Sequence, residues 1–273
     1  MNNLKFSTTL TVQYPTPFSA FTPEQFGEGL QWVKESGFDA VELCISNYKD
    51  IDVNSLKDKI NSFGLNISTI STGQARSLEN ISLLHEGDAL KKAQERMLQH
   101  IEAASIFCSK VTLGLLRGLG STNNAKSEKK QLAKNLEQII EYASKKNVTI
   151  ILECINRYET ALFNDASSTV EFIKNDLGNP ECIGILWDVF HANIEDPNFG
   201  EAIDEMGNKL KHVHIADSNR MFPGYGHTDF NALGKLLINS NFSEYLSFEC
   251  FNKPSLDVIL KDSSTFISNM KSL

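Results

Sequence analysis

A chain of 273 residues with 41% hydrophobic and 22% charged residues has the composition of a soluble globular protein with a large core. Its formal net charge of −8 argues against general binding to nucleic acid or to anionic membranes, because both need basic surface. The sequence has no signal-peptide pattern, no membrane-spanning run and no Cys-x-x-Cys pair among its five cysteines. We therefore expect a cytoplasmic protein with reduced thiols, without a membrane or nucleic-acid partner.

Short segments rich in β-branched and other apolar residues recur along the chain, about 30 residues apart, as in an α/β barrel. These segments predict eight strands, with helical patterns between them. The predicted strands are Leu4–Val12, Asp39–Ile45, Leu65–Thr72, Lys110–Leu116, Val148–Leu152, Ile183–Asp188, Leu210–Asp217 and Tyr245–Cys250.

The helical patterns have recognisable ends. The first helix begins at Thr22–Gln25, a capping box with Pro23 at the first helical position, and it ends at Gly37. Ser127–Lys146 repeats apolar residues at helical spacing and predicts a long helix. Gly73–Asp88 shows no such period, so it predicts a long polar loop that could fold over a site as a lid.

Alternating strands and helices specify a parallel sheet, and eight such units fit a (β/α)8 TIM barrel. No Pro-, Gly- or Ser-rich linker interrupts them, so we expect a single domain over residues 1–273. A doubly wound open sheet is the alternative. It is disfavoured because no Gly-x-Gly-x-x-Gly follows the first strand.

Four consecutive strands end in residues that can bind a metal ion, namely Glu153, Asp188, His214 and Glu249. Their spacings of 35, 26 and 35 residues are close to one barrel repeat, and active-site groups of barrels lie at the carboxyl ends of strands. Three converging carboxylates cannot all stay ionised without a cation. Oxygen and nitrogen ligands without thiolate suit Mn²⁺, Mg²⁺ or Co²⁺. Any one of the four could be a capping acid or a core histidine, but four at matching strand ends favour one shared metal site.

Further polar residues follow the same strands. His191 lies three residues beyond Asp188 and is expected to face the same cavity. Arg220 and Glu159 lie in loops that would line this cavity, although either could instead form a surface ion pair.

Other candidates have simpler interpretations. His212 has the strand parity of His214 but lies one layer deeper, which favours a core role. Glu42 ends the second strand, yet no neighbour in the sequence supports it, so it ranks below the other acids. His227 and Asp229 are expected to order a loop. Surface roles are expected for His85 and His100.

Five motifs resemble those of the ketose 3-epimerases, the tagatose/psicose 3-epimerase branch of the sugar phosphate isomerase/epimerase superfamily, which has xylose isomerase-like barrels. The motifs are Leu152–Glu159, Trp187–Glu195, His212–Arg220, Pro223–His227 and Phe248–Glu249. The resemblance follows the whole barrel order and is most specific from Val148 onward.

The resemblance implies roles for seven residues. It implies one divalent metal, often Mn²⁺, and an acid/base pair of Glu153 and Glu249. It also implies, by analogy, a homodimer or homotetramer. The implied metal ligands are Glu153, Asp188, His214 and Glu249, and the implied sugar-binding residues are Glu159, His191 and Arg220.

The sequence departs from the family pattern at Cys154, where proline or another small residue is common. It also departs in two early loops that help to select substrate, Gly73–Asp88 and Leu116–Gly120. These departures leave the metal site intact and leave the identity of the sugar open.

The predicted function is a metal-dependent epimerase that interconverts ketoses at C3 through an enediolate, with two glutamates as acid and base. Aldose–ketose isomerisation of a sugar or sugar phosphate at the same metal site is the alternative. An apurinic endonuclease-like activity is less favoured, because Thr72–Gln74 and Leu116–Gly118 supply no histidine for a trinuclear zinc cluster. A non-catalytic sugar-binding module is not required, since all acid/base positions are filled.

Overall fold

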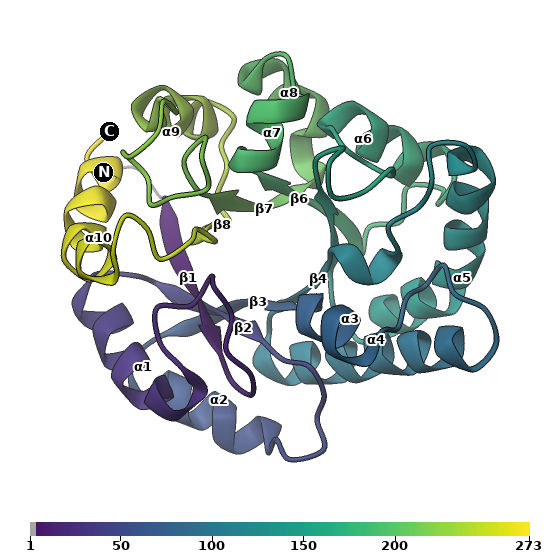
Figure 1. The fold of residues 1–273 in the computed structure, drawn as a ribbon, viewed down its shortest axis with the longest axis horizontal. Helices are drawn as coiled ribbons and strands as arrows, with labels where there is room; N and C mark the ends of the chain where they lie inside the picture. The colour runs from purple at the N-terminus through teal and green to yellow at the C-terminus, as the bar shows by residue number, and fades with distance from the viewer. Residues whose placement is uncertain (1–3) are drawn as a thin grey trace.

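The computed structural model describes residues 4–273, in which eight parallel strands close into a barrel inside a ring of helices (Figure 1). Each strand pairs in parallel with the next, and β1 pairs with β8 to close the ring. The predicted (β/α)8 barrel is confirmed. The strands are β1 (Lys5–Thr11), β2 (Ala40–Cys44), β3 (Asn66–Ser71), β4 (Lys110–Leu113), β5 (Ile150–Cys154), β6 (Ile183–Asp188), β7 (Leu210–Ile215) and β8 (Tyr245–Phe248).

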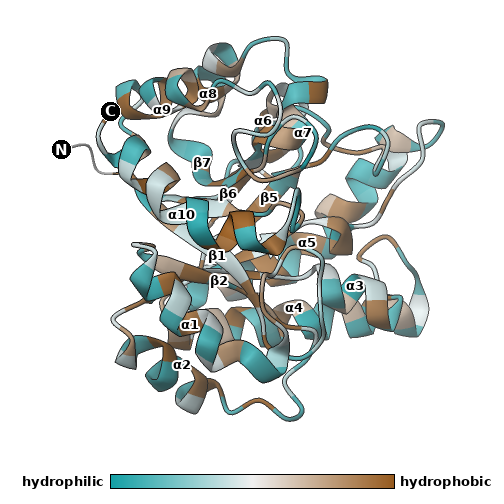
Figure 2. Cartoon of the chain, turned by 60° about the vertical axis from the view of Figure 1, so that its left-hand side comes forward, coloured by the Kyte–Doolittle hydropathy of each residue, from teal (hydrophilic) through white to brown (hydrophobic). Residues whose placement is uncertain are grey.

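The helices surround the barrel, and hydrophilic and hydrophobic residues alternate along them (Figure 2). Within residues 4–273, none combines the length and the apolar character needed to cross a membrane. The α-helices are α1 (Phe26–Glu35), α2 (Val53–Ser62), α3 (Gly73–Glu79), α4 (Gly87–Phe107), α5 (Ala125–Lys145), α6 (Ala166–Asn175), α7 (Val189–Glu195), α8 (Phe199–Met206), α9 (Phe230–Asn239) and α10 (Leu256–Lys271). The 3₁₀ turns are η1 (Pro23–Gln25), η2 (Leu115–Arg117) and η3 (Gly207–Lys209).

Burial explains why these segments adopt these structures. Every residue of β5 and of β6 is buried, as expected for strands covered by helices on one side and filled by side chains on the other. The long helix α5 buries a stripe at helical spacing, consisting of Leu132, Leu136, Ile139 and Ala143. The apolar runs of the strands and the apolar stripes of the helices, both visible in the sequence, are therefore the residues that the barrel buries.

The predicted start of the first helix is also confirmed. Thr22 and Gln25 form a reciprocal capping box, in which the Thr22 backbone N–H donates to Gln25 Oε1 at 3.2 Å. The chain then passes from the turn η1 into α1. The helix begins where the sequence places its cap because the orphan backbone donors find partners there.

The prediction of a long loop over Gly73–Asp88 is wrong. Residues 73–79 form the short helix α3 and α4 already begins at Gly87, so only residues 80–86 form a loop. Only Ala75 of α3 is buried, so the sequence carries no apolar period there. Tertiary contacts hold the helix instead: Gln74 donates to the Tyr14 carbonyl at 2.6 Å, and Glu79 pairs with Arg96.

Candidate active site

The carboxyl ends of the last four strands bring four predicted ligands together. One ligand atom from each of Glu153, Asp188, His214 and Glu249 lies within 4.8 Å of all the others. Glu153 lies on β5, Asp188 ends β6, His214 lies on β7, and Glu249 directly follows β8. Parallel pairing places these ends at one rim of the barrel, which is why side chains so distant in the sequence converge.

His214 is at the centre of this cluster. Its Nδ1 lies 3.7 Å from Glu153 Oε1, 3.8 Å from Asp188 Oδ2 and 3.4 Å from Glu249 Oε2. Asp188 Oδ1 accepts a hydrogen bond from the Phe190 backbone N–H at 2.7 Å, and this bond starts α7. The backbone of α7 thereby fixes the direction of the second carboxylate oxygen, Oδ2.

Two buried atoms of the cluster fit a cation. Within residues 4–273, neither His214 Nδ1 nor Asp188 Oδ2 has a hydrogen-bond partner, although both are shielded from solvent. Buried polar atoms are seldom left unpaired, because each costs about 1–3 kcal/mol. The donor set of three carboxylates and one imidazole therefore suits a divalent ion held between these atoms.

The pKa values of Glu153 and Asp188 are shifted in opposite directions. Burial, together with the charge of Glu249, raises the pKa of Glu153, although His214 acts in the opposite direction. Burial alone would also raise the pKa of Asp188, but the neighbouring histidines and Arg220 outweigh it and hold that pKa well below its usual range. Two carboxylates in one site thus differ in proton affinity, as in acid/base sites.

Arg220 lies beside this cluster. Its guanidinium donates to Glu159 at 3.0 Å and to Glu249 at 3.3 Å, and its centre lies 4.8 Å from the Phe18 ring and 4.9 Å from the Phe190 ring. The residue adopts a left-handed backbone conformation, with φ of 61°. The surface-ion-pair interpretation is excluded for Arg220, because the guanidinium is largely buried between aromatic rings at the site.

His191 is also directed by a neighbour. Asn156 donates its side-chain N–H to His191 Nδ1 at 2.6 Å, so the ring proton is carried on Nε2. This Nε2 lies 3.7 Å from Asp188. The imidazole therefore presents a donor to the interior of the site.

A cavity of about 340 Å³ covers the cluster, within the usual range for small-molecule sites. Its wall includes Tyr14–Phe18 from the loop after β1, and Gln74 and Leu78 from α3. Glu153, Glu159, His191, Arg220 and Glu249 line it. Asp188 and His214 are buried beneath. The structure thus brings all seven predicted residues to one place.

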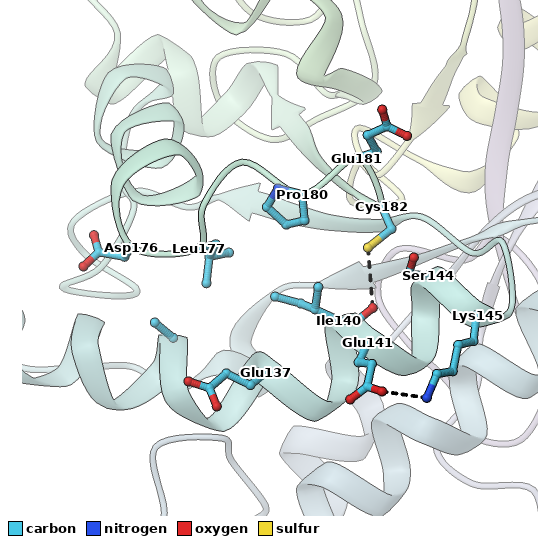
Figure 3. A pocket seen from close by; sticks show the side chains of 11 residues that line it. Glu137, Ile140, Glu141, Ser144, Lys145, Asp176, Leu177, Pro180, Glu181 and Cys182 are labelled. Carbon is cyan, nitrogen blue, oxygen red and sulfur yellow. Dashed lines mark hydrogen bonds and ion pairs between the residues drawn. The ribbon is translucent and has the colours of Figure 1, made fainter.

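A larger cavity of about 720 Å³ lies outside the barrel between α5 and the segment that precedes β6 (Figure 3). There Glu141 pairs with Lys145, and the Cys182 thiol donates to the Ile140 carbonyl. It contains none of the predicted site residues and lies at the amino ends of the strands, where barrels carry stabilising rather than catalytic groups.

Two important residues of the site were missed or ranked too low. Glu42 is fully buried, and its carboxylate accepts from the Nε2 atoms of His212 and His214, each at 3.1 Å. The prediction that Glu42 ends the second strand is wrong, because it lies in the middle of β2 and its side chain points into the barrel towards β7. Arg117 is also fully buried and donates to the Glu153 carbonyl at 2.7 Å, while burial lowers its pKa to about 10. No periodic pattern marks a buried arginine in a loop.

The predictions for Asp229, His227 and His100 had different outcomes. Asp229 caps α9, and His227 hydrogen-bonds Ser218 at 2.9 Å, which confirms a loop-ordering role for this pair. The surface role predicted for His100 is wrong. Its ring is fully buried and shares a hydrogen bond of 2.7 Å with the Tyr48 hydroxyl.

The sequence matches the xylose isomerase-like TIM barrel family over residues 30–270. The chain belongs to this family. It is 30% identical to an L-ribulose 3-epimerase of Mesorhizobium japonicum, over 87% of this chain and 79% of that protein. It is 28% identical to a 3-dehydro-D-guloside 4-epimerase of Escherichia coli, over 86% of this chain and 90% of that protein.

Among solved structures, a 3-keto-D-glucoside 4-epimerase from E. coli superposes with a TM-score of 0.80. It covers 99% of this chain and 100% of that chain at 21% identity, a likeness that shows the fold. The sequence relatives confirm the resemblance predicted from the motifs of the last four strands. They also confirm the predicted enzyme class, an isomerase acting on carbohydrates.

Proposed function

We propose that this isomerase is a metal-dependent ketose epimerase that inverts the configuration at C3. One observation carries the proposal: Glu153 and Glu249 reach the same cavity from strands three apart in the barrel, and Asp188 and His214 come from the two strands between them. Two carboxylates that approach one cavity from different strands meet the main demand of epimerisation, which is one acid/base group for each face of a carbon.

The metal centre is part of this proposal. Glu153, Asp188, His214 and Glu249 would hold one divalent ion, and when bound it would supply Lewis-acid polarisation of the sugar carbonyl. We propose Mn²⁺, with Mg²⁺ or Co²⁺ as substitutes, because carboxylate and imidazole ligands suit these ions.

The protein groups then carry the proton. One glutamate removes the C3 proton next to the C2 carbonyl, which leaves an enediolate, and the other glutamate returns a proton to the opposite face. The raised pKa of Glu153 suits a group that must take a proton from carbon and release it near neutral pH. Arg220 hydrogen-bonds Glu249 and so fixes the direction of the second carboxylate.

Three further residues would hold the sugar. Arg220 and His191 present N–H donors to the cavity and would bind sugar oxygens, including the oxygen that gains charge in the enediolate. Glu159 accepts from Arg220 and has capacity left to accept from a sugar hydroxyl. Because Arg220 is already packed between aromatic rings, little of its conformational freedom remains to be lost on binding.

Turnover of ketoses in D₂O with Mn²⁺, followed by proton NMR, tests the proposal. Since each glutamate exchanges its proton with solvent, deuterium should enter C3 of the product and not C1. Glu153→Gln and Glu249→Gln should each abolish epimerisation, and either variant that still binds metal should exchange the C3 proton of one epimer only. Glu137→Gln is the matched control, since Glu137 is exposed on α5 and should be dispensable.

The labelling pattern separates this proposal from its alternatives. Deuterium at C1, or at C2 of an aldose product, would refute epimerisation and establish aldose–ketose isomerisation. Loss of activity in Glu137→Gln would show that the loss in the other variants is not specific to the site.

The similarity to a 4-epimerase favours a second candidate, which is epimerisation at C4 of a sugar that carries its carbonyl at C3. The chemistry is the same, because the inverted carbon again adjoins a carbonyl. A panel that includes 3-keto sugars distinguishes the two: deuterium at C4 of a 3-keto sugar, with no exchange in any ketose, would favour this candidate.

A further inference from the structure

Glu42 makes a contact across the barrel that the proposed reaction does not explain. It lies on β2, whereas the two histidines that it contacts lie on β7, and these strands are not neighbours. Its oxygens lie 3.1 Å from His212 Nε2, and 3.1 Å and 3.2 Å from His214 Nε2. All three side chains are at most 2% exposed.

This contact determines which ring nitrogen of His214 is free. An ionised carboxylate only accepts hydrogen bonds, so the His214 Nε2 next to it must carry a proton. The opposite nitrogen, Nδ1, is the atom that faces Glu153, Asp188 and Glu249. It has no hydrogen-bond partner among the residues that the structure describes. The geometry therefore offers a nitrogen lone pair to the metal position.

We propose that Glu42 is a positioning residue that fixes the tautomer and the ring orientation of His214 for metal binding. The inference rests on the metal centre proposed above. Carboxylates that accept from the second nitrogen of a metal-binding histidine orient the ring and make it a stronger ligand, and their loss commonly weakens metal binding by about 10- to 100-fold.

His212 completes the arrangement. Its Nε2–H is the second donor to Glu42, and its ring packs edge to face against His214, with centroids 5.3 Å apart. The carboxylate is therefore held by two donors and cannot rotate away from His214 without breaking the contact with His212. Strand parity predicted a core role for His212. In that deep position its side chain holds Glu42 in place.

The same three residues could be mistaken for a second metal site, because their ligand atoms also lie within 4.8 Å of one another. The two imidazoles instead meet the carboxylate at hydrogen-bonding distance, through the nitrogen that must carry a proton. This arrangement satisfies the buried carboxylate without a cation, whereas the cluster at Nδ1 leaves its polar atoms unpaired.

The test is Glu42→Gln in the full-length protein. Glutamine keeps the volume of glutamate, but its amide oxygen can satisfy only one imidazole well, and its NH₂ group cannot accept from the other. We expect the Kd for Mn²⁺, measured by EPR titration of chelator-stripped protein, to rise by about tenfold or more. Tyr48→Phe is the matched control, since it removes a 2.7 Å hydrogen bond to the buried His100 of α4, and neither residue is a hydrogen-bond partner of Glu42.

A second readout reports the tautomer directly. In ¹⁵N-histidine-labelled protein stripped of metal, at a pH high enough for the imidazole to be neutral, the His214 ring should carry its proton on Nε2. In Glu42→Gln this single tautomer should give way to a mixture. A residue that only stabilised the fold would lower the free energy of unfolding without changing either the tautomer or the Kd.

The outcomes separate the inference from the proposed function. If wild-type protein binds no Mn²⁺, both are overturned. Loss of the carboxylate should raise the Kd by about tenfold. If wild type binds Mn²⁺ and the Kd of Glu42→Gln stays within about twofold of the wild-type value, the positioning role is overturned and the metal centre remains. Should Glu42→Gln fail to fold, Glu42→Asp, which is one methylene too short to reach both rings, is held to the same criterion.

Discussion

His100 should make the stability of the protein depend on pH in a predictable direction. Its ring is fully buried beside Tyr48. Burial, reinforced by the charge of Arg96, lowers its pKa from 6.5 to about 3. In the unfolded chain the imidazole regains its ordinary pKa. Below pH 6.5 the unfolded state therefore binds a proton that the folded state does not, and the protein loses stability as the pH falls from 6.5 towards 3.

The magnitude follows from the two pKa values. Each pH unit below the unfolded-state pKa costs about 1.4 kcal/mol until the folded-state pKa is reached. At about pH 5 the histidine should therefore have cost about 2 kcal/mol, while at about pH 7.5 its cost is close to zero. His100→Gln, which cannot take up a proton, should lose about 2 kcal/mol less than wild type between these two conditions.

Urea denaturation of chelator-stripped protein at both pH values measures this difference, and removal of metal excludes its own pH dependence. His85→Gln is the matched control, because it makes the same exchange in the loop before α4, and it should behave as wild type. If His100→Gln and wild type lose the same stability to within about 0.5 kcal/mol, the buried ring is not excluded from protonation and the reasoning fails.

Three further changes should affect the site in different ways. Metal analysis should find about one divalent ion per chain, and Asp188→Asn should weaken its binding while the apoprotein remains folded, as its unfolding curve will show. Arg220→Ala should lower kcat/KM by about tenfold or more without changing metal content, because charge-assisted hydrogen bonds to the sugar are lost; unchanged kinetics would count against its role. In Gly114→Ala the new Cβ would lie 2.5 Å from Glu153 Oε2, so the carboxylate must move and metal affinity should fall, whereas Gly27→Ala, with no atom nearer than 3.9 Å, should have no effect.

The elements of the barrel and the convergence of Glu153, Asp188, His214 and Glu249 could be predicted from the sequence. Both depend on information that is read along the chain. Apolar periods separate strands from helices, and parallel order places every strand end at the same rim. Four potential metal ligands at four successive strand ends are therefore expected to lie close together in space.

Contacts across the barrel could not be predicted in this way. Glu42 and His214 meet because closure of the sheet turns the interior faces of β2 and β7, three strands apart in the ring, towards each other. The depth at which their side chains meet depends on the stagger of the strands. Nothing near Glu42 in the sequence indicates this partner, so it was ranked too low.

The remaining corrections have the same cause. α3 forms through contacts with the loop after β1 and with α4, not through an apolar face of its own. His100 and Arg117 are buried because neighbouring segments cover them and supply Tyr48 and the Glu153 carbonyl as partners. The local sequence pattern determined which helices and strands form and which strand ends carry metal-binding or acid/base residues. The closed tertiary structure decided which polar groups are buried and what holds each of them, because that pairing is made between segments that are distant in the chain.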